Sequence, residues 1–341
     1  MPFNEKEQFM YKPDFKNLKE NLLCMEKRST PLIELHINNE FKQKFFSKND
    51  ITLQDNIMLS LELCHDFIIV SKGILKPAQS IGKTTEKGGK LWASESDSII
   101  NSLEDIRQYD WMDPDREDFS EFVKLENLMP EGMKILATGG KIFTASWMLL
   151  GFNNFCMYLY ENENLVKKLF EKVGSLQYRI FEKMLGFKGT GAIAALDDIA
   201  YTEGLMVSAK FLRDNLFPWY EKMGKVCNKR NIPFIYHSDG DISEIIDDLI
   251  NCGFNAIHPI EPKAMKIENL KEKYSRKLCF LGNIEMDTLI RGTVDEVRNL
   301  VKKNLEIFAQ DGFYGCGSSN TITEAMPVEN VIAMCKAVRN M

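Results

Sequence analysis

Three residues of metal-ligand type each follow a short apolar run in this chain. His237 and Asp239 stand two positions apart in Tyr236-His237-Ser238-Asp239-Gly240-Asp241, and Cys316 stands far downstream between two glycines. Zinc accepts nitrogen, oxygen and sulfur donors together, and a catalytic site needs three protein ligands plus an open position. The pattern therefore favours a metal centre, if the apolar runs end at one rim of the same sheet.

Plainer interpretations stand beside this one. His237 could be a hydrogen-bonded structural histidine at a strand end. Asp239 could turn the loop with Gly240 and cap the next helix, a role that aspartate often fills. Cys316 is a poor core filler, because its flanking glycines let backbone or ligand approach closely.

The elements that must position these residues alternate in type. Short apolar runs alternate with amphipathic helical segments, which is the pattern of βα units around a parallel sheet. Five such units in roughly 150 residues favour a closed (β/α)8 TIM barrel, with a doubly wound sheet as the alternative. The predicted strands are Leu32–Leu35, Lys134–Thr138, Ala192–Leu196, Phe234–His237, Ala256–Pro259, Leu278–Gly282 and Phe313–Cys316.

Helix boundaries can also be identified from the sequence. Asp241-x-x-Glu244 and Thr293-x-x-Glu296 are capping boxes that predict helix starts, and Gly253 predicts the end of the first of these helices. Residues from about 40 to 130 are more polar, and Gly82–Lys90 is typical of an exposed loop. We predict that this region is an inserted cap over the barrel mouth within a single domain of residues 1–341.

Composition limits the kinds of partner that the chain can have. The formal charge of −6 provides no basic field for nucleic acid or anionic lipid. The first residues are polar, and no apolar run approaches the ~20 residues that a membrane span needs. The eight cysteines form no CxxC pair, so reduced thiols in a cytoplasmic protein are expected.

Several segments, taken in order, resemble the uroporphyrinogen decarboxylase superfamily, whose members are TIM barrels. The resemblance covers roughly residues 15–341. The segments that carry it are Trp147–Glu161, Asp197–Tyr201 with Ser208 and Pro218, His237–Asp241, Ile257–Pro262 and Met326–Val331.

The resemblance implies a choice between two chemistries. True uroporphyrinogen decarboxylases carry an arginine-containing N-terminal segment that holds the carboxylates of the tetrapyrrole. The corresponding stretch here, Leu35–Phe41, has no arginine, so that activity is disfavoured. The corrinoid-dependent methyltransferases of the superfamily instead hold zinc with a His-x-Cys pair and a later cysteine, a pattern that His237, Asp239 and Cys316 resemble with aspartate in place of the first cysteine.

The resemblance thus implies a zinc-dependent methyltransferase. It would move a methyl group between a small methyl donor, such as a methoxylated compound, and a corrinoid carried by a partner protein. A carboxylate ligand makes the zinc site harder than two thiolates would, which suits polarising an oxygen. Glu261, at the end of the next predicted strand, is a further candidate metal ligand and an alternative to Asp239 as the oxygen donor.

Four more residues are candidates for catalysis or substrate binding. Asp197 and Asp198 are adjacent acids at a predicted strand end, where one could orient substrate or stabilise charge while the other caps a helix. Tyr201 is an aromatic donor that could face substrate, and His258 could bind substrate or serve the scaffold. Two rival functions remain open at this point, a metal-free decarboxylase that uses Asp197 or Asp198, and a non-catalytic barrel that binds a corrinoid or another ligand.

Overall fold

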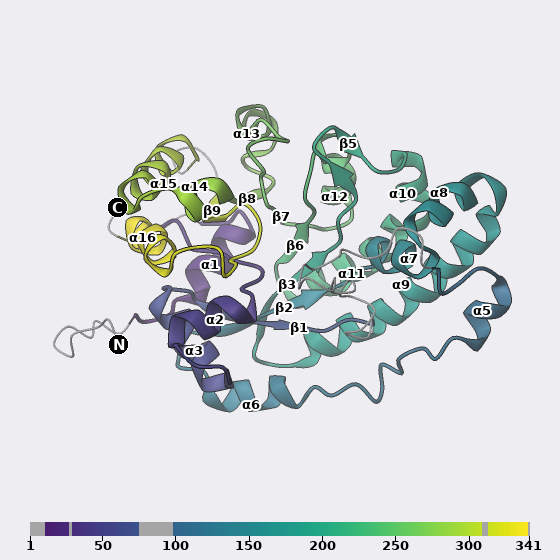
Figure 1. The fold of residues 1–341 in the computed structure, drawn as a ribbon, viewed down its shortest axis with the longest axis horizontal. Coiled ribbons are helices and arrows are strands. Elements are labelled where there is room, and N and C mark those ends of the chain that lie inside the picture. The colour runs from purple at the N-terminus through teal and green to yellow at the C-terminus, as the bar shows by residue number, and fades with distance from the viewer. Residues whose placement is uncertain (1–10, 27–28, 75–97, 309–312, 340–341) are drawn as a thin grey trace, which may run out of the picture.

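Seven parallel strands form a curled sheet in a computed structural model, which describes residues 11–26, 29–74, 98–308 and 313–339 (Figure 1). Their order across the sheet is β1-β2-β3-β6-β7-β8-β9, so each strand pairs with its neighbour in the chain apart from a short β4–β5 hairpin. The strands are β1 (Phe67–Ser71), β2 (Lys134–Gly139), β3 (Thr190–Leu196), β4 (Ala200–Tyr201), β5 (Gly204–Leu205), β6 (Phe234–His237), β7 (Ala256–His258), β8 (Cys279–Ile284) and β9 (Tyr314–Ser318).

An N-terminal segment supplies the eighth position beside β9. Leu32 and Ile37 form parallel bridges to Cys316 and Ile322, and the Ile33 amide donates to the Cys316 carbonyl at 2.9 Å. The predicted TIM-barrel class is therefore confirmed, with seven strands in the sheet and this segment next to the last of them. Six of the predicted strands are present, whereas the predicted strand Leu32–Leu35 forms only an isolated bridge at Leu32. The prediction did not include β1 or the short strands β4 and β5.

The strands are buried on both faces, as parallel strands in α/β folds usually are. Inside the curl, small and apolar side chains such as Ala194, Ile235 and Leu281 pack together, and helix α1 (Phe15–Leu22) adds Phe15 and Leu18 to the same cluster. The larger cluster lies between the sheet and the outer helices. Side chains that alternate along a strand thus enter two different cores.

The outer helices surround the sheet, with α14, α15 and α16 together at one end of the molecule and α7, α8 and α10 at the other (Figure 1). They are α2 (Asn39–Phe46), α3 (Leu53–Glu62), α5 (Leu103–Gln108), α6 (Ser120–Leu128), α7 (Phe143–Leu150), α8 (Phe152–Glu161), α9 (Glu163–Gly186), α10 (Ala209–Asn215), α11 (Phe217–Arg230), the 3-10 turn η1 (Ser243–Ile245), α12 (Ile246–Asn251), α13 (Ile267–Tyr274), α14 (Met286–Arg291), α15 (Val294–Phe308) and α16 (Val328–Arg339).

The two predicted capping boxes have different outcomes. At Thr293 the box is complete, because its hydroxyl accepts from the Glu296 amide while the Glu296 carboxylate accepts from the Thr293 amide. At Asp241 the carboxylate accepts instead from the Ser243 amide at 2.8 Å, and a 3-10 turn precedes α12. Gly253 ends α12 as predicted, with a φ of +96°.

The predicted cap over residues 40–130 is not confirmed. Its described part contains β1, which is a strand of the barrel sheet, together with α2, α3, α5 and α6. The hydrophobic run Phe67–Val70 forms a barrel strand although the residues around it are polar. Because this strand pairs with β2, the region is not a separate insertion. The predicted loop Gly82–Lys90 lies outside the described residues.

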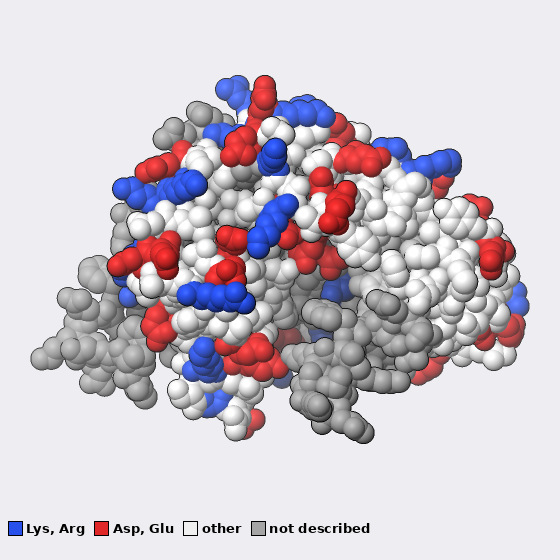
Figure 2. All heavy atoms as spheres, turned by 45° about the horizontal axis from the view of Figure 1, so that its top comes forward, with Lys and Arg blue, Asp and Glu red and all other residues white. Residues whose placement is uncertain are grey.

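No helix among the described residues is long and apolar enough to span a membrane. Acidic and basic side chains are interspersed over the face of the molecule that Figure 2 presents. The surface of that face is therefore of mixed charge.

A buried acid lies between the N-terminal segment and β9. The carboxylate of Glu34 accepts from the Ser318 amide at 2.7 Å and from the Ser318 hydroxyl at 2.6 Å, and the side chain is almost fully buried. Burial raises the pKa of Glu34 to about 8, although the hydrogen bonds from Ser318 oppose the shift. The group is therefore protonated in the folded chain at neutral pH.

Glu34 should make the stability of the protein fall as pH rises. The folded chain holds this proton up to about pH 8, whereas an unfolded glutamate releases it near 4.5, so the folded state binds more protons between these values. We expect the free energy of unfolding to decrease across this window, by at most about 1.4 kcal/mol per pH unit from this group. Glu34→Gln should remove that component in denaturant titrations at several pH values.

The exposed Glu306 on α15 provides the control, since Glu306→Gln should leave the slope as in the parent protein. Equal slopes for the parent and Glu34→Gln would mean that Glu34 is already ionised in the folded chain.

Candidate functional site

A cavity of about 560 Å³ opens where the parallel strands end. Its walls come from the carboxyl ends of β1, β2, β3 and β6, from residues 35–36 of the N-terminal segment, and from Asn320 and Thr321 after β9. In barrels of this class the loops at this end carry the chemistry. The predicted pair His237 and Asp239 lines the cavity, together with Asp198.

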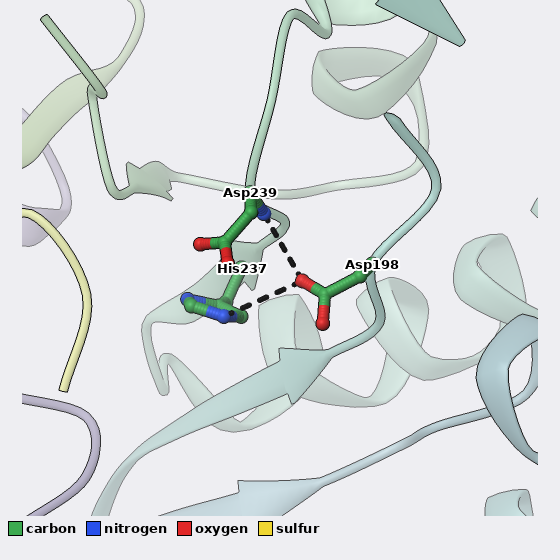
Figure 3. Close-up of side chains that lie close together, drawn as sticks. All are labelled: Asp198, His237 and Asp239. Atoms are coloured by element: carbon green, nitrogen blue, oxygen red, sulfur yellow. Dashed lines mark hydrogen bonds and ion pairs between the residues drawn. The ribbon is translucent and has the colours of Figure 1, made fainter. Parts of the chain in front are cut away.

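Asp198, His237 and Asp239 form a compact group on the β3–β6 side of the cavity (Figure 3). One potential ligand atom from each lies within 4.8 Å of the others. The Asp198 Oδ1 accepts from the Asp239 amide at 3.0 Å and lies 3.6 Å from the His237 Nε2. Adjacent parallel strands place these residues together, since Asp198 follows β3 and His237 ends β6.

Asp239 has an oxygen available for a cation. Its Oδ2 accepts from the Asn320 side-chain amide at 2.7 Å, whereas its Oδ1 is buried without a hydrogen-bond partner among the described residues. Burial, together with the charges of Asp198 and Glu261, raises the pKa of Asp239 to about 7. A buried carboxylate oxygen without a partner beside a second carboxylate and an imidazole fits a divalent cation such as zinc.

His237 is held by the second histidine, His258. The two Nδ1 atoms are 2.8 Å apart and the rings are stacked with centroids 5.1 Å apart. Burial lowers the pKa of His237, with a further lowering by Lys141 that Asp198 opposes, and a neutral imidazole is the form that binds a metal. If His237 donates from Nδ1, its Nε2 is left as the free donor atom for a cation, which is the usual second-shell arrangement.

His258 itself does not line the cavity. It is fully buried, burial lowers its pKa well below the ordinary value, and its Nε2 has no partner among the described residues. The prediction that His258 binds substrate therefore has no support in this placement. Its contact with His237 makes it a positioning residue, which is the scaffold alternative considered for it.

Cys316 is not brought together with the group of three. It lies fully buried in the core between the sheet and the helices, beside Tyr314 and Glu34. Its neighbour Gly315 faces the interior instead, where an added Cβ would lie 2.7 Å from Leu281. Because successive side chains of a strand point to opposite faces, the thiol of Cys316 is directed away from the inside of the barrel.

Glu261 lies close to the group without joining it. Its Oε2 accepts from the Gly240 amide at 3.2 Å, and its negative charge raises the pKa of Asp239. Glu261 therefore holds the turn that carries Asp239. The close passage of this turn against the β4–β5 hairpin requires Gly240, because an added Cβ would lie 2.5 Å from the Tyr201 carbonyl oxygen.

The adjacent acids Asp197 and Asp198 have different surroundings. Asp197 is fully buried and accepts from the amides of residues 142–144 at 2.7–2.9 Å and from the Tyr220 hydroxyl at 2.7 Å. Asp198 is about half exposed and lines the cavity. Asp197 therefore caps the start of α7, and its predicted catalytic role has no support in this placement, whereas Asp198 is placed for chemistry.

Tyr201 lies at the tip of the β4–β5 hairpin, with 52% of its surface exposed. Its carbonyl oxygen accepts from the Asp241 amide at 2.9 Å, so its backbone supports the Asp239 turn. The side chain is not part of the cavity wall. Its predicted roles in catalysis and substrate binding are therefore not supported by contact with the cavity.

The sequence analysis did not predict two residues of the site. Asn320 holds Asp239, yet it lies in a polar stretch after β9 that contains no recognisable motif. Lys141 lines the cavity after β2 and follows the glycine pair Gly139-Gly140, which belongs to no phosphate-binding motif. The position of each just after a strand end is the one signal that could have identified it.

The two adjacent acids should differ in their effect on stability. We expect Asp197→Asn to lower the free energy of unfolding by about 3 kcal/mol, because an amide nitrogen would then face buried donors. Asp198→Asn, its matched control, should cost less than about 1 kcal/mol, since that side chain is half exposed. Urea unfolding of the two variants measures this, and an equal loss in both would contradict the assignment.

The comparisons with known proteins agree with the geometry. The family model of uroporphyrinogen decarboxylase (URO-D) matches residues 50–341. The search of curated proteins returned no match.

Among solved structures, a methyltransferase from Methanosarcina mazei is similar, with a TM-score of 0.71 and 16% identity over 96% of this chain and 99% of that one. A sugar phosphate isomerase/epimerase from Parabacteroides distasonis matches with a TM-score of 0.41 and 10% identity, over 91% of this chain and 93% of that one. The first likeness concerns the fold alone at that identity, and the second is too weak to support an argument. With its family model matched over most of its length, this chain belongs to the uroporphyrinogen decarboxylase family.

Proposed function

We propose that the chain is a zinc-dependent methyltransferase that moves a methyl group between a small methyl donor and the corrinoid of a partner protein. The observation that supports this most directly is the group Asp198, His237 and Asp239, which presents two carboxylates and an imidazole in a cavity at the carboxyl ends of barrel strands. The structural similarity to a protein described as a methyltransferase is a second support.

Zinc would be held by His237 Nε2, by Asp239 Oδ1 and by Asp198. Bound there, it would supply Lewis acidity toward the heteroatom that carries the methyl group. The corrinoid would supply the methyl-carrying metal, and the cavity mouth is the side from which a partner could present it. Asp239 replaces the thiolate of related sites, so an oxygen-bearing donor such as a methoxylated compound suits the ligand set.

The chain's own residues keep the ligands in place. Asn320 fixes the Asp239 carboxylate through Oδ2 and leaves Oδ1 for the cation. His258 orients the His237 ring, and Glu261 holds the Gly240 amide next to Asp239. Such second-shell contacts align the ligands before a cation arrives.

Metal analysis of the purified protein tests the ligand assignment. We expect about one zinc per chain in the parent protein and loss of that zinc in His237→Ala and Asp239→Ala. Asn320→Ala should weaken zinc affinity about 10- to 100-fold, because it removes an orienting hydrogen bond. Competition with a chromogenic chelator measures each affinity.

Cys316→Ser is the decisive control for this assignment. The thiol lies in the helix-facing core, so this variant should retain its zinc. Loss of zinc in Cys316→Ser would contradict the proposed ligand set and restore the sulfur ligand that the sequence pattern suggested.

An activity assay tests the reaction. We expect the zinc-loaded protein to methylate free reduced cobalamin from methoxylated donors, and a chelator should abolish the activity until zinc is restored. Absorbance changes of the cobalamin follow the transfer. Release of carbon dioxide from a carboxylated substrate, unaffected by chelator, would favour the decarboxylase alternative instead.

A further inference from the structure

The cavity carries opposite charges on its two sides. Asp198 and Asp239 lie on the β3–β6 side, and two lysines, Lys72 and Lys141, lie after β1 and β2. These four residues are the charged ones among the described residues of its wall. The two lysines differ in whether a carboxylate accompanies them.

Lys72 is already neutralised. Its Nζ lies 3.1 Å from the Glu117 Oε1, and both side chains are mostly buried. Lys141 forms no ion pair with any residue in the part of the chain that the structure describes. The positive charge of Lys141 nevertheless acts on the site, because it contributes to lowering the pKa of both His36 and His237.

The backbone at Lys141 is fixed on both sides. The Gln177 side-chain amide donates to the Lys141 carbonyl at 3.0 Å, and the next three amides donate to Asp197. Before it, Gly140 has a φ of +74°, and an added Cβ there would lie 3.2 Å from Ala195. Lys141 is exposed and lines the cavity, and its fixed backbone lowers the entropic cost of using the residue to bind a ligand.

The balance of charge favours an anionic ligand. A divalent cation on Asp198, His237 and Asp239 would be neutralised by the two carboxylates, and Lys72 is neutralised by Glu117. Among the described residues of the cavity, Lys141 then carries the one positive charge that no carboxylate pairs, at an exposed position on the wall. A ligand with one negative charge would remove that imbalance.

We propose that Lys141 binds the carboxylate of an anionic substrate, such as a methoxylated aromatic acid, whose other end faces Asp198, His237 and Asp239. This proposal rests on the proposed function, both for the cation in the charge balance and for the orientation of the methyl-bearing end. The cavity of about 560 Å³ is large enough for a substituted benzoate.

Matched pairs of carboxylates and neutral alcohols test the proposal. The probes are 4-methoxybenzoate against 4-methoxybenzyl alcohol, and methoxyacetate against 2-methoxyethanol, titrated calorimetrically into the full chain with and without added zinc. The parent protein should bind at least one carboxylate about 10- to 100-fold more tightly than its alcohol. Lys141→Gln should abolish that preference, and Lys141→Arg should retain it.

The controls separate this proposal from general charge effects and from the proposed function. Lys167→Gln, at an exposed position on α9, should keep the full preference. A Lys141-dependent preference in a protein that transfers no methyl group would leave the anion site in place and reject the methyltransferase. Equal affinity for both members of each pair, a preserved preference in Lys141→Gln, or no binding of either carboxylate would overturn the proposal.

Discussion

The buried carboxylate of Asp197 holds the start of α7 against the end of β3, on which the geometry of the cavity depends. Asp197 directly follows β3, accepts hydrogen bonds from the first amides of α7 and from the Tyr220 hydroxyl, and is fully buried. The partial positive charge at a helix start and the hydrogen bonds compensate an anion that burial alone would make costly. Asp198 stands on one side of this anchor and Lys141 on the other, so a single buried contact sets the distance between the two walls of the cavity.

From that anchor, a series of hydrogen bonds passes through the site. Asp198 accepts the Asp239 amide, Asn320 holds the Asp239 carboxylate, and His258 holds the His237 ring. Each contact fixes the orientation of a neighbouring residue. Polar networks of this kind are stable only when most of their members are satisfied, so Asp239 Oδ1, buried without a hydrogen-bond partner among the described residues, points to a ligand.

The sequence predicts the barrel and half of the site, for reasons that particular residues make clear. The apolar runs that end at Leu196 and His237 are strand signals, and residues just after strand ends are candidates in any parallel barrel. The orientation of Cys316 could not be predicted in this way. Strands buried on both faces show no alternation of polar and apolar residues, so the sequence does not tell which face a side chain joins.

The sequence also does not predict which of two adjacent acids is buried, or which distant amide contacts the site. Asp197 and Asp198 are chemically identical, and only the packing of α7 and Tyr220 against one of them decides which is buried. Asn320 contacts Asp239 across 81 positions of the chain, and no local sequence pattern predicts this contact. Similarly, β1 lies within a region whose polar composition does not predict a barrel strand. Its pairing with β2 depends on tertiary packing more than on local composition.

The proximity of the three donor residues along the chain has a consequence for biosynthesis. Asp198, His237 and Asp239 lie at the ends of two sheet neighbours, β3 and β6, so the ribosome has made all three residues before it adds residues 240–341. Asn320 and β9 emerge later. A nascent chain therefore contains all three donor residues well before it contains the Asn320 amide that aligns the Asp239 carboxylate.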